Sequence, residues 1–174
     1  MSFSAAIGSP LRPVKELEDR RRRRTKGPRR PLPSAAAVEG PCQEPPPPEL
    51  KAGIAEFNAG LYFECHETLE ELWMARAGPD RWLYQGILQV GVSLYHLRQG
   101  NWKGAVNLME RGLHLLSAYP ACCQGVEVDA LRRNSERVLR YLVSEGRPGV
   151  ENFDWDLAPK IEIADYPIQT KGES

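Results

Sequence analysis

Apolar residues recur at helical spacing in five segments between residues 49 and 146. This periodicity predicts helices over residues 49–60, 61–78, 80–100, 101–119 and 126–146. Glycine and proline mark their ends, because Gly60, Gly78, Pro79 and Pro120 stand between consecutive segments. No segment beyond Lys160–Ala164 alternates with the two-residue period of a strand. The sequence therefore predicts an all-α fold.

The segment 80–100 differs from the other four because apolar residues surround most of its circumference. A helix that is apolar on all sides is usually buried, so we expect this segment to be the central helix. Asn101 follows it directly and is a plausible N-cap for the next helix, because an asparagine side chain can accept a hydrogen bond from a first-turn amide.

A weak internal repeat emerges when the chain is shifted by forty residues along itself. The matched pairs are Gly60 with Gly100, Tyr62 with Trp102, Cys65 with Ala105, Leu69 with Met109 and Glu70 with Glu110. Each copy has a turn glycine, then an aromatic, a small and an apolar residue, which suits a tight helical hairpin. We therefore predict a compact bundle of about five helices, with two tetratricopeptide-like hairpins around the central helix.

The charges of the chain are unevenly distributed, although the net charge is +0. Residues 1–48 carry ten Lys and Arg against five Asp and Glu, whereas residues 49–174 carry thirteen against eighteen. Ten of the fifteen prolines also fall in residues 1–48. Such a composition offers little apolar surface to bury. We expect a disordered arm over 1–48, a helical domain over 49–146 and an irregular tail over 147–174 that packs partly on the domain.

The run Arg20–Arg24 is the strongest basic patch of the chain. It could make weak, non-specific phosphate contacts with nucleic acid, but it has no interleaved aromatic residues for base stacking. A solvated tail without a partner is the other interpretation of this arm, and the one we favour.

Four cysteines, Cys42, Cys65, Cys122 and Cys123, show neither zinc-ligand spacing nor the pattern of a disulfide framework. We expect free thiols, a reducing compartment and therefore a cytoplasmic location. A plastid location is the alternative, if the Arg-rich arm is a transit peptide, although its acidic residues count against this. No apolar run approaches the length of a membrane span.

Candidate chemistry gathers in the segment 61–78. His66 and Glu70 are one helical turn apart and share a side of the predicted helix, whereas Glu67 projects toward solvent with Glu64 and Glu71. His66 and Glu70, together with Glu67, are the candidate catalytic residues.

Gln85, Gln89 and His96 form a polar stripe on the predicted central helix. Because the connection around residues 76–80 is short, the two helices are expected to be antiparallel neighbours, with Glu70 near Gln85 or Gln89. The candidate binding residues around this inter-helix groove are Gln85, Gln89, His96, Tyr62 and Trp73.

Three interpretations of this groove remain open. The side chains could form a satisfied buried network that fixes the helix register. A Glu–His pair could act in acid–base chemistry. His66, Glu70 and His96 could also be weak candidates for binding a divalent metal, but the segment lacks the second histidine of a zinc-protease motif, so we expect no metal and no other cofactor.

The stretches FNAGLYFECHETLEELW and WLYQGILQVGVSLYHLRQG carry a specific pattern of residues. Its members are Gly60, Tyr62, Phe63, His66, Glu67, Leu69, Glu70, Trp73, Leu83, Gln85, Gly86, Ile87, Leu88 and Gln89, and His96 matches a further position. Over roughly residues 50–145 the sequence resembles the family called domain of unknown function 309, which occurs in bacteria, archaea and plastids. The resemblance implies a compact all-α fold and no established activity. Its pattern includes Glu67.

We therefore expect a non-enzymatic helical scaffold that binds an unidentified protein or small-molecule partner through the groove near His66 and Glu70. The alternative is a small hydrolase-like enzyme, metal-assisted or acid–base, at the same groove, and the sequence leaves that choice open.

Overall fold

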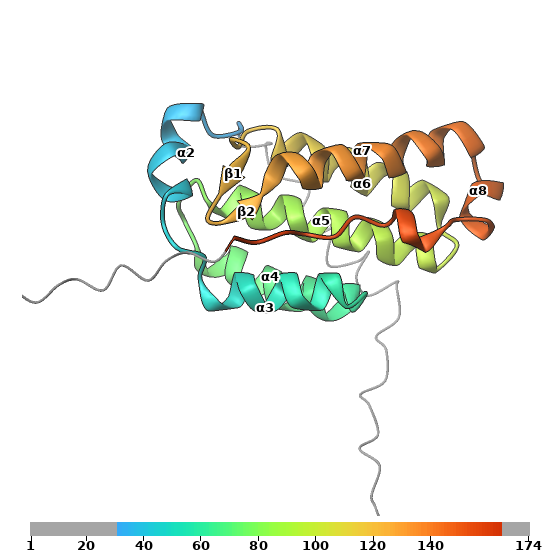
Figure 1. Ribbon diagram of the computed structural model, residues 1–174, viewed down its shortest axis with the longest axis horizontal. Coiled ribbons are helices and arrows are strands. Elements are labelled where there is room, and N and C mark those ends of the chain that lie inside the picture. Colours follow the sequence, from blue (N-terminus) through green and yellow to red (C-terminus); the bar gives the residue numbers. More distant parts are fainter. Residues whose placement is uncertain (1–30, 165–174) are drawn as a thin grey trace, which may run out of the picture. The chain divides into compact units, whose positions relative to one another are not determined.

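The computed structural model describes residues 31–164 (Figure 1). Its elements, in chain order, are α2 (Ala35–Cys42), α3 (Pro48–Asn58), α4 (Tyr62–Ala75), α5 (Arg81–Arg98), α6 (Trp102–Leu116), β1 (Cys122–Cys123), β2 (Val126–Glu127), α7 (Val128–Glu145), α8 (Pro148–Glu151) and the 3-10 turn η1 (Trp155–Leu157). The predicted all-α fold is confirmed. The helices α3 to α7 correspond to the five predicted helices, with ends that differ by a few residues.

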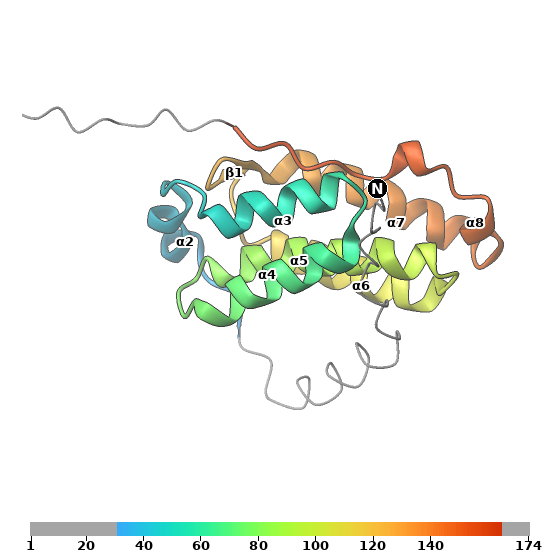
Figure 2. The ribbon, with the colours of Figure 1, turned by 90° about the horizontal axis from the view of Figure 1, so that it is seen from below.

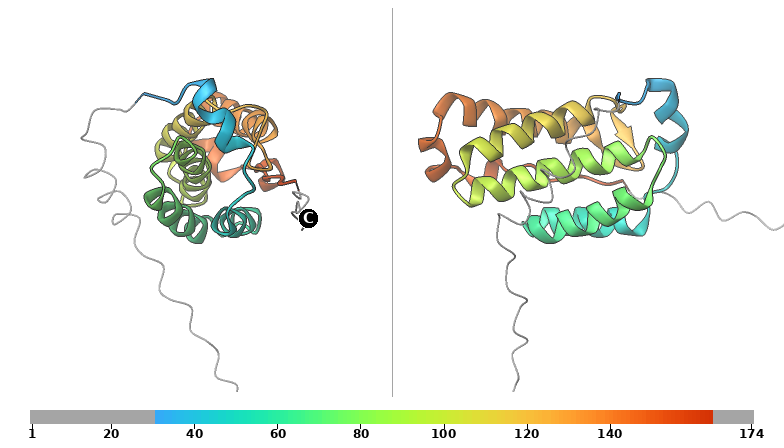
Figure 3. Two further views of the ribbon diagram at one scale, coloured as in Figure 1. Left: turned by 90° about the vertical axis from the view of Figure 1, so that its left-hand side faces the viewer. Right: turned by 180° about the vertical axis from the view of Figure 1, so that it is seen from behind.

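The helix α5 is the centre of the bundle, as predicted. It packs between α4 and α6, and its whole length from Tyr84 to Leu97 is buried except for two glutamines (Figures 2 and 3). Close approach to α6 depends on two glycines. A Cβ at Gly112 would lie 3.0 Å from the carbonyl oxygen of Gly86, which is tighter than nine in ten real Cβ contacts. The two backbones therefore nearly touch at this crossing.

The turns before α4 and before α6 share one geometry. Gly60 and Gly100 both have left-handed φ angles, of +75° and +74°, which glycine adopts without a steric penalty. In each turn the amide after the glycine reaches back across it: Leu61 donates to the carbonyl of Glu56 and Asn101 to that of His96, both at 2.9 Å. This is the bonding of a Schellman helix end. The forty-residue repeat of the sequence thus coincides with a repeated turn.

The chain after α7 returns along the bundle toward the β1–β2 hairpin (red in Figure 1). Asn58 holds it, because its side-chain amide donates to the carbonyl of Ile161 at 2.9 Å and accepts from the amide of Ile161 at 2.8 Å. Ile163 then pairs with Val126 as an isolated bridge. Phe153 and Ile161 are buried. The aromatic and aliphatic residues of this segment thus reach the bundle at two points.

The predicted boundary of the domain at residue 48 is corrected by α2, which falls inside the expected arm. Val38 and Cys42 of this helix are buried, and Ser34 caps its first turn by accepting from the amide of Ala37. The stretch is therefore helical, although its proline content suggested disorder. The rest of the predicted arm, residues 1–30 with the run Arg20–Arg24, lies outside the described residues.

The prediction of four free thiols is wrong for two of them. Cys42 and Cys123 form a disulfide across 81 residues of sequence, whereas Cys65 and Cys122 are free. A pairing over such a distance leaves no local pattern in the sequence. The argument for a reducing compartment loses its basis, and the cytoplasmic location stays a prediction.

Cys123 lies in a short hairpin that the sequence pattern did not predict. Its two central residues, Gln124 and Gly125, both have positive φ angles, of 50° and 76°, as a type I′ turn requires. The strands β1 and β2 have two residues each, which is too short to show a strand period.

None of the helices in the described part of the chain is long and apolar enough to cross a membrane.

Candidate functional site

The helix α4 places the candidate pair on one side and the other acidic residues on the opposite side. His66 Nε2 and Glu70 Oε2 are 4.0 Å apart, and their side chains are 16% and 24% exposed. Glu67 is fully on the solvent side, together with Glu64 and Glu71. The distance is too long for a hydrogen bond, so the carboxylate alone does not fix the orientation of the imidazole.

Two contacts fix the register of α4 on α5. At one end the rings of Phe63 and Tyr95 lie 6.1 Å apart, and at the other the guanidinium of Arg81 lies 4.9 Å from the ring centroid of Trp73. The helices are therefore antiparallel. Interpolation between these contacts puts Glu70 level with the first turns of α5.

The sides of α5 have different neighbours. A Cβ at Gly86 would meet Leu116 of α6, and one at Gly91 would meet Phe57 of α3 and Cys65 of α4. At 100° per residue, Gln85 and Gln89 fall on a third side of the helix, away from both of these directions. Because Arg81 at the start of α5 contacts Trp73, the edge of α4 lies next to the first turn of this third side.

The two glutamines of this third side are half-buried and their acceptor atoms are fully buried. Neither Gln85 Oε1 nor Gln89 Oε1 accepts a hydrogen bond from the described residues. A buried polar atom without a partner costs on the order of 1–3 kcal/mol. We call His66, Glu70 and Trp73 of α4 together with Gln85 and Gln89 of α5 the glutamine face.

His96 belongs to a different set of contacts. Its Nδ1 lies 2.9 Å from Nδ2 of Asn101, whose Oδ1 accepts from the amide of Gly104 at 2.9 Å. The predicted N-cap at Asn101 is thus confirmed, and its contact with His96 helps to hold the Asn101 side chain in place. The described residues hold no group of three or more His, Cys, Asp or Glu side chains placed to bind a metal ion, so His66, Glu70 and His96 are not brought together as ligands.

Tyr62 also lies apart from the glutamine face. It is buried at the start of α4, with its ring edge-on to Phe57 at 5.5 Å. Its ring also stacks on that of Trp155 at 6.4 Å, and the guanidinium of Arg98 lies beside both rings, 4.8 Å from the centroid of Tyr62 and 5.1 Å from that of Trp155. Burial raises the pKa of Tyr62, and the cation of Arg98 opposes that shift. Tyr62, which follows the turn at Gly60, therefore packs against Arg98, which precedes the turn at Gly100, and against Trp155 of the C-terminal segment.

Cys65 is fully buried on α4, as its place on the apolar stripe predicts. Burial raises the pKa of its thiol to about 12, with a smaller contribution from Glu56. A thiol protonated at neutral pH is neither a nucleophile nor a ready metal ligand. Cys65 is a packing residue.

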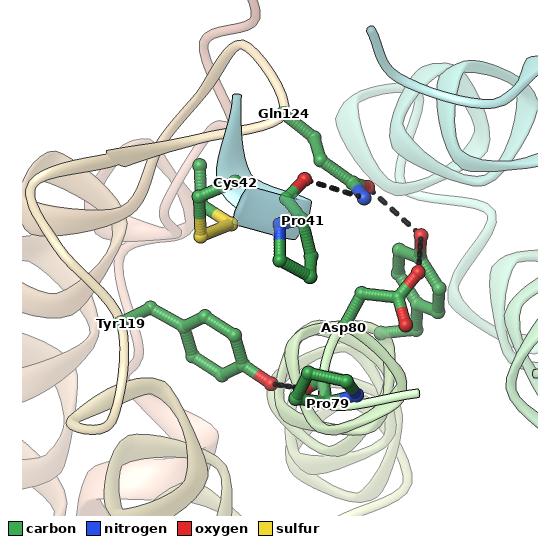
Figure 4. Close-up of a disulfide and its surroundings, with 8 residues drawn as sticks. Pro41, Cys42, Pro79, Asp80, Tyr119 and Gln124 are labelled. Carbon is green, nitrogen blue, oxygen red and sulfur yellow. Dashed lines mark hydrogen bonds between the residues drawn. A yellow bond between two sulfur atoms is a disulfide. The ribbon is translucent and has the colours of Figure 1, made fainter. Parts of the chain in front are cut away.

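A second polar group, which the sequence pattern did not reveal, surrounds the disulfide (Figure 4). Gln124 is its hub: Nε2 donates to the carbonyl of Pro41 at 3.2 Å, Oε1 accepts from the hydroxyl of Tyr84 at 2.8 Å, and the backbone amide donates to the carbonyl of Cys42 at 2.8 Å. Asp80 lies on the other side of Tyr84, with Oδ2 at 3.0 Å from the hydroxyl. We call Cys42, Cys123, Gln124, Tyr84 and Asp80 the disulfide cluster.

The disulfide cluster joins three distant parts of the chain. Tyr84 and Asp80 stand at the start of α5, Cys42 ends α2, and Gln124 is in the hairpin before α7. Burial is the main cause that raises the pKa of the Tyr84 hydroxyl, and the neighbouring Asp80 carboxylate adds to it. The hydroxyl is therefore a fixed hydrogen-bonding group at neutral pH.

The only local signal for the disulfide cluster is the Gln124–Gly125 dipeptide, which suits a turn although the first position favours Asn, Asp or Gly. Gln124 is almost fully buried despite its left-handed φ angle. Its hydrogen bonds within the cluster offset the strain of that conformation.

Comparison with known proteins supports the resemblance predicted from the sequence. Residues 50–108 match the model of the family described as Domain of unknown function (DUF309), a shorter stretch than the expected 50–145. The matched residues run from α3 to the middle of α6 and include the whole glutamine face. The disulfide cluster lies mostly outside them.

Two similar proteins are both named as uncharacterized. The Uncharacterized protein YpuF of Bacillus subtilis (strain 168) is 38% identical over 78 residues, which are 44% of this chain and 45% of that protein. An Uncharacterized protein of Aquifex aeolicus (strain VF5) is 25% identical over 91 residues, 52% of this chain and 27% of that protein. The chain thus matches less than half the length of each relative.

Proposed function

We propose that the chain is a non-enzymatic helical scaffold that binds a protein or small-ligand partner through the glutamine face. The observation that carries the proposal is the pair of buried acceptors, Gln85 Oε1 and Gln89 Oε1, that accept no hydrogen bond within the described residues. Such groups destabilise a folded protein, so their presence calls for an explanation such as a role in binding. Both side chains are half-buried, and a ligand that draws their amides outward and donates hydrogen bonds to both oxygens would remove the penalty on binding.

The negative charge of α4 limits the kinds of partner that could bind beside it. Its fourteen residues, Tyr62–Ala75, include four glutamates and no lysine or arginine. Acceptors on α5 and negative charge on α4 together favour a cationic partner rich in N–H donors, such as an arginine-bearing peptide segment. The aromatic ring of Trp73 at the margin of the face suits the flat guanidinium group, as its contact with Arg81 illustrates.

The experiment is a fluorescence-anisotropy titration of the full chain with a labelled arginine-rich peptide. Glu70→Gln and Glu71→Gln form a matched pair, because each removes one charge from α4, the first beside His66 and the second on the exposed side. We expect Glu70→Gln to weaken binding about tenfold, or about 1.4 kcal/mol, and Glu71→Gln to leave it nearly unchanged. Equal losses would indicate non-specific attraction and would contradict the proposal.

The scaffold itself is proposed to consist of two tetratricopeptide-like hairpins, α3–α4 and α5–α6. The shared turn at Gly60 and Gly100 supports this interpretation. A further hairpin repeat would be needed for a solenoid, so the chain would be a two-unit variant of such an architecture. We propose a cytoplasmic location, with the plastid as the alternative.

An acid–base or metal-assisted enzyme is the second candidate. Partial exposure of both His66 and Glu70, 4.0 Å apart, favours it, because catalysis requires solvent and substrate to reach the pair. Elemental analysis of the tag-free protein beside a His66→Ala variant tests the metal-assisted form. Stoichiometric metal in the parent and none in the variant would support the enzyme over the scaffold.

A further inference from the structure

The attachment of α2 to the rest of the described chain is concentrated at one place. Cys42 is disulfide-bonded to Cys123, and the carbonyls of Pro41 and Cys42 accept hydrogen bonds from Gln124. Val38 adds one buried apolar side chain. The covalent bond, the two hydrogen bonds and the C-terminal end of the helix all meet at the β1–β2 hairpin.

On its own α2 is a weak helix. It has eight residues, fewer than the roughly 12–15 that an isolated helix needs in water. Its last turn contains Gly40 and Pro41, and both residues disfavour a helix. The helix therefore depends on its attachment to the hairpin.

The two bridged cysteines differ in how much of the residue reaches solvent. Cys42 is 7% exposed, whereas Cys123 is fully buried. An attacking thiolate must approach a sulfur atom in line with the disulfide bond, and the attack falls on Cys42 because this residue lies nearer to solvent.

The neighbouring free thiol does not compete for this bond. Cys122 is exposed, but partial burial and the carboxylate of Glu127 raise the pKa of its thiol. A protonated thiol exchanges slowly with disulfides, so Cys122 is a poor nucleophile toward the Cys42–Cys123 pair.

We propose that the Cys42–Cys123 disulfide is a reversible thiol–disulfide exchange site whose substrate is a dithiol reductant, and that its reduction releases α2. One thiolate of the dithiol attacks Cys42 Sγ, the bond to Cys123 breaks, and the Cys123 thiolate takes a proton. The second thiol of the reductant, as thiolate, then attacks its own sulfur in the mixed disulfide. Cys42 leaves and is protonated. The protein disulfide gains two electrons and two protons, which the dithiol loses as it becomes a disulfide.

Release of α2 would also reach the start of α5. Gln124 bonds Pro41 with one end of its amide and the Tyr84 hydroxyl with the other. Asp80, which also contacts Tyr84, directly precedes Arg81 and its stack on Trp73. The redox state of the pair is thereby connected, through one side chain, to the end of the helix that carries Gln85.

The experiment compares the full chain in its oxidised and reduced states by limited digestion with a glutamate-specific protease. Glu39 in α2 is exposed and is the reporter, and Glu49 in the first turn of α3 is the internal reference. Dithiothreitol is the probe dithiol, and mass spectrometry after thiol alkylation counts the free cysteines. Far-UV circular dichroism checks that the helices persist in both states.

We expect reduction without denaturant, cleavage after Glu39 at least about tenfold faster in the reduced protein, unchanged cleavage after Glu49, and recovery on reoxidation. Cys122→Ser should behave as the parent, and Cys42→Ser should be cleaved quickly in both conditions. A disulfide that resists the dithiol in the folded protein would overturn the proposal. Reduction that leaves cleavage after Glu39 unchanged would overturn it as well.

Discussion

Two glutamine environments in this protein look alike in composition and differ in bonding. In the disulfide cluster, Gln124 uses both atoms of its amide and its backbone N–H in hydrogen bonds. On the glutamine face, Gln85 and Gln89 bury their acceptor atoms without using them among the described residues. Buried amides of the first kind join elements together. Amides of the second kind lower stability and leave hydrogen-bonding capacity that a ligand could use once the side chains turn toward it.

The difference separates a structural region from a candidate binding region. The disulfide cluster lies at the end of the bundle where α2, the hairpin and α5 meet, and a partner is not needed to satisfy it. The glutamine face lies within the stretch that matches the DUF309 family model, residues 50–108. Substitutions in the first region should therefore lower stability, and substitutions in the second should change binding.

The largest expected effect is the loss of the disulfide. A cross-link between residues 81 apart restricts the unfolded chain, and the chain-entropy estimate of its contribution is about 4.5 kcal/mol. Cys42→Ser should lower the melting temperature by roughly 10 °C in thermal unfolding under non-reducing conditions. Cys122→Ser, one residue from the bridge, is the matched control and should shift it little. Equal melting temperatures for parent and Cys42→Ser would show that the bond does not stabilise the folded state.

The second-largest expected loss of stability is at Gln124, which hydrogen-bonds other members of the disulfide cluster. Gln124→Leu keeps the approximate size of the side chain and removes its hydrogen bonds to Tyr84 and Pro41, which leaves buried groups unsatisfied. We expect a loss of about 2 kcal/mol in the free energy of unfolding, measured by urea denaturation. A neutral result would mean that the cluster is not a structural network.

A smaller effect is expected from its hydroxyl partner. Tyr84→Phe removes the group that contacts Asp80 and Gln124 and keeps the buried ring. The expected loss is about 1 kcal/mol. In the double variant with Gln124→Leu the losses should not add, because both remove the same hydrogen bond. Additive losses would contradict the network.

The smallest expected effect concerns the reactivity of the two free cysteines rather than the stability of the fold. Cys65 is buried with a pKa raised to about 12, whereas Cys122 is exposed with a pKa raised less strongly. Because the thiolate is the reactive form, the rate of alkylation of Cys122 should keep rising with pH above the ordinary thiol pKa. Cys65 should stay unlabelled until the protein unfolds. Peptide mass spectrometry after timed iodoacetamide treatment measures both, and rapid labelling of native Cys65 would contradict its burial.

Local patterns predicted the helices of this protein well. Breaks at Gly60 and Gly78–Pro79 correctly separated α3, α4 and α5, Pro120 marked the end of α6, and an all-round apolar segment correctly marked α5 as the central helix. The acidic residue Glu67 was correctly placed on the solvent side of α4 by its helical position. These features depend on residues within one or two turns of each other, which a periodicity analysis can relate.

Long-range pairing was beyond such an analysis. Cys42 meets Cys123 only because α2 folds onto a hairpin of two-residue strands, and neither element has a periodic pattern. His96 lies on the predicted polar stripe, but its ring nitrogen lies beside Asn101 at the next turn. The direction of a side chain within a stripe depends on partners that helical position alone does not identify.

The central claim is that Gln85 and Gln89 are kept for recognition and not for the stability of the fold. The most direct measurement is the melting temperature of the Gln85→Leu/Gln89→Leu double variant, recorded without any added ligand beside the parent and Gln124→Leu. The account predicts a rise of a few degrees for the double variant, about 1 kcal/mol or more, and a fall for Gln124→Leu. A fall in both would show that the two glutamines hold the fold together and would contradict the account.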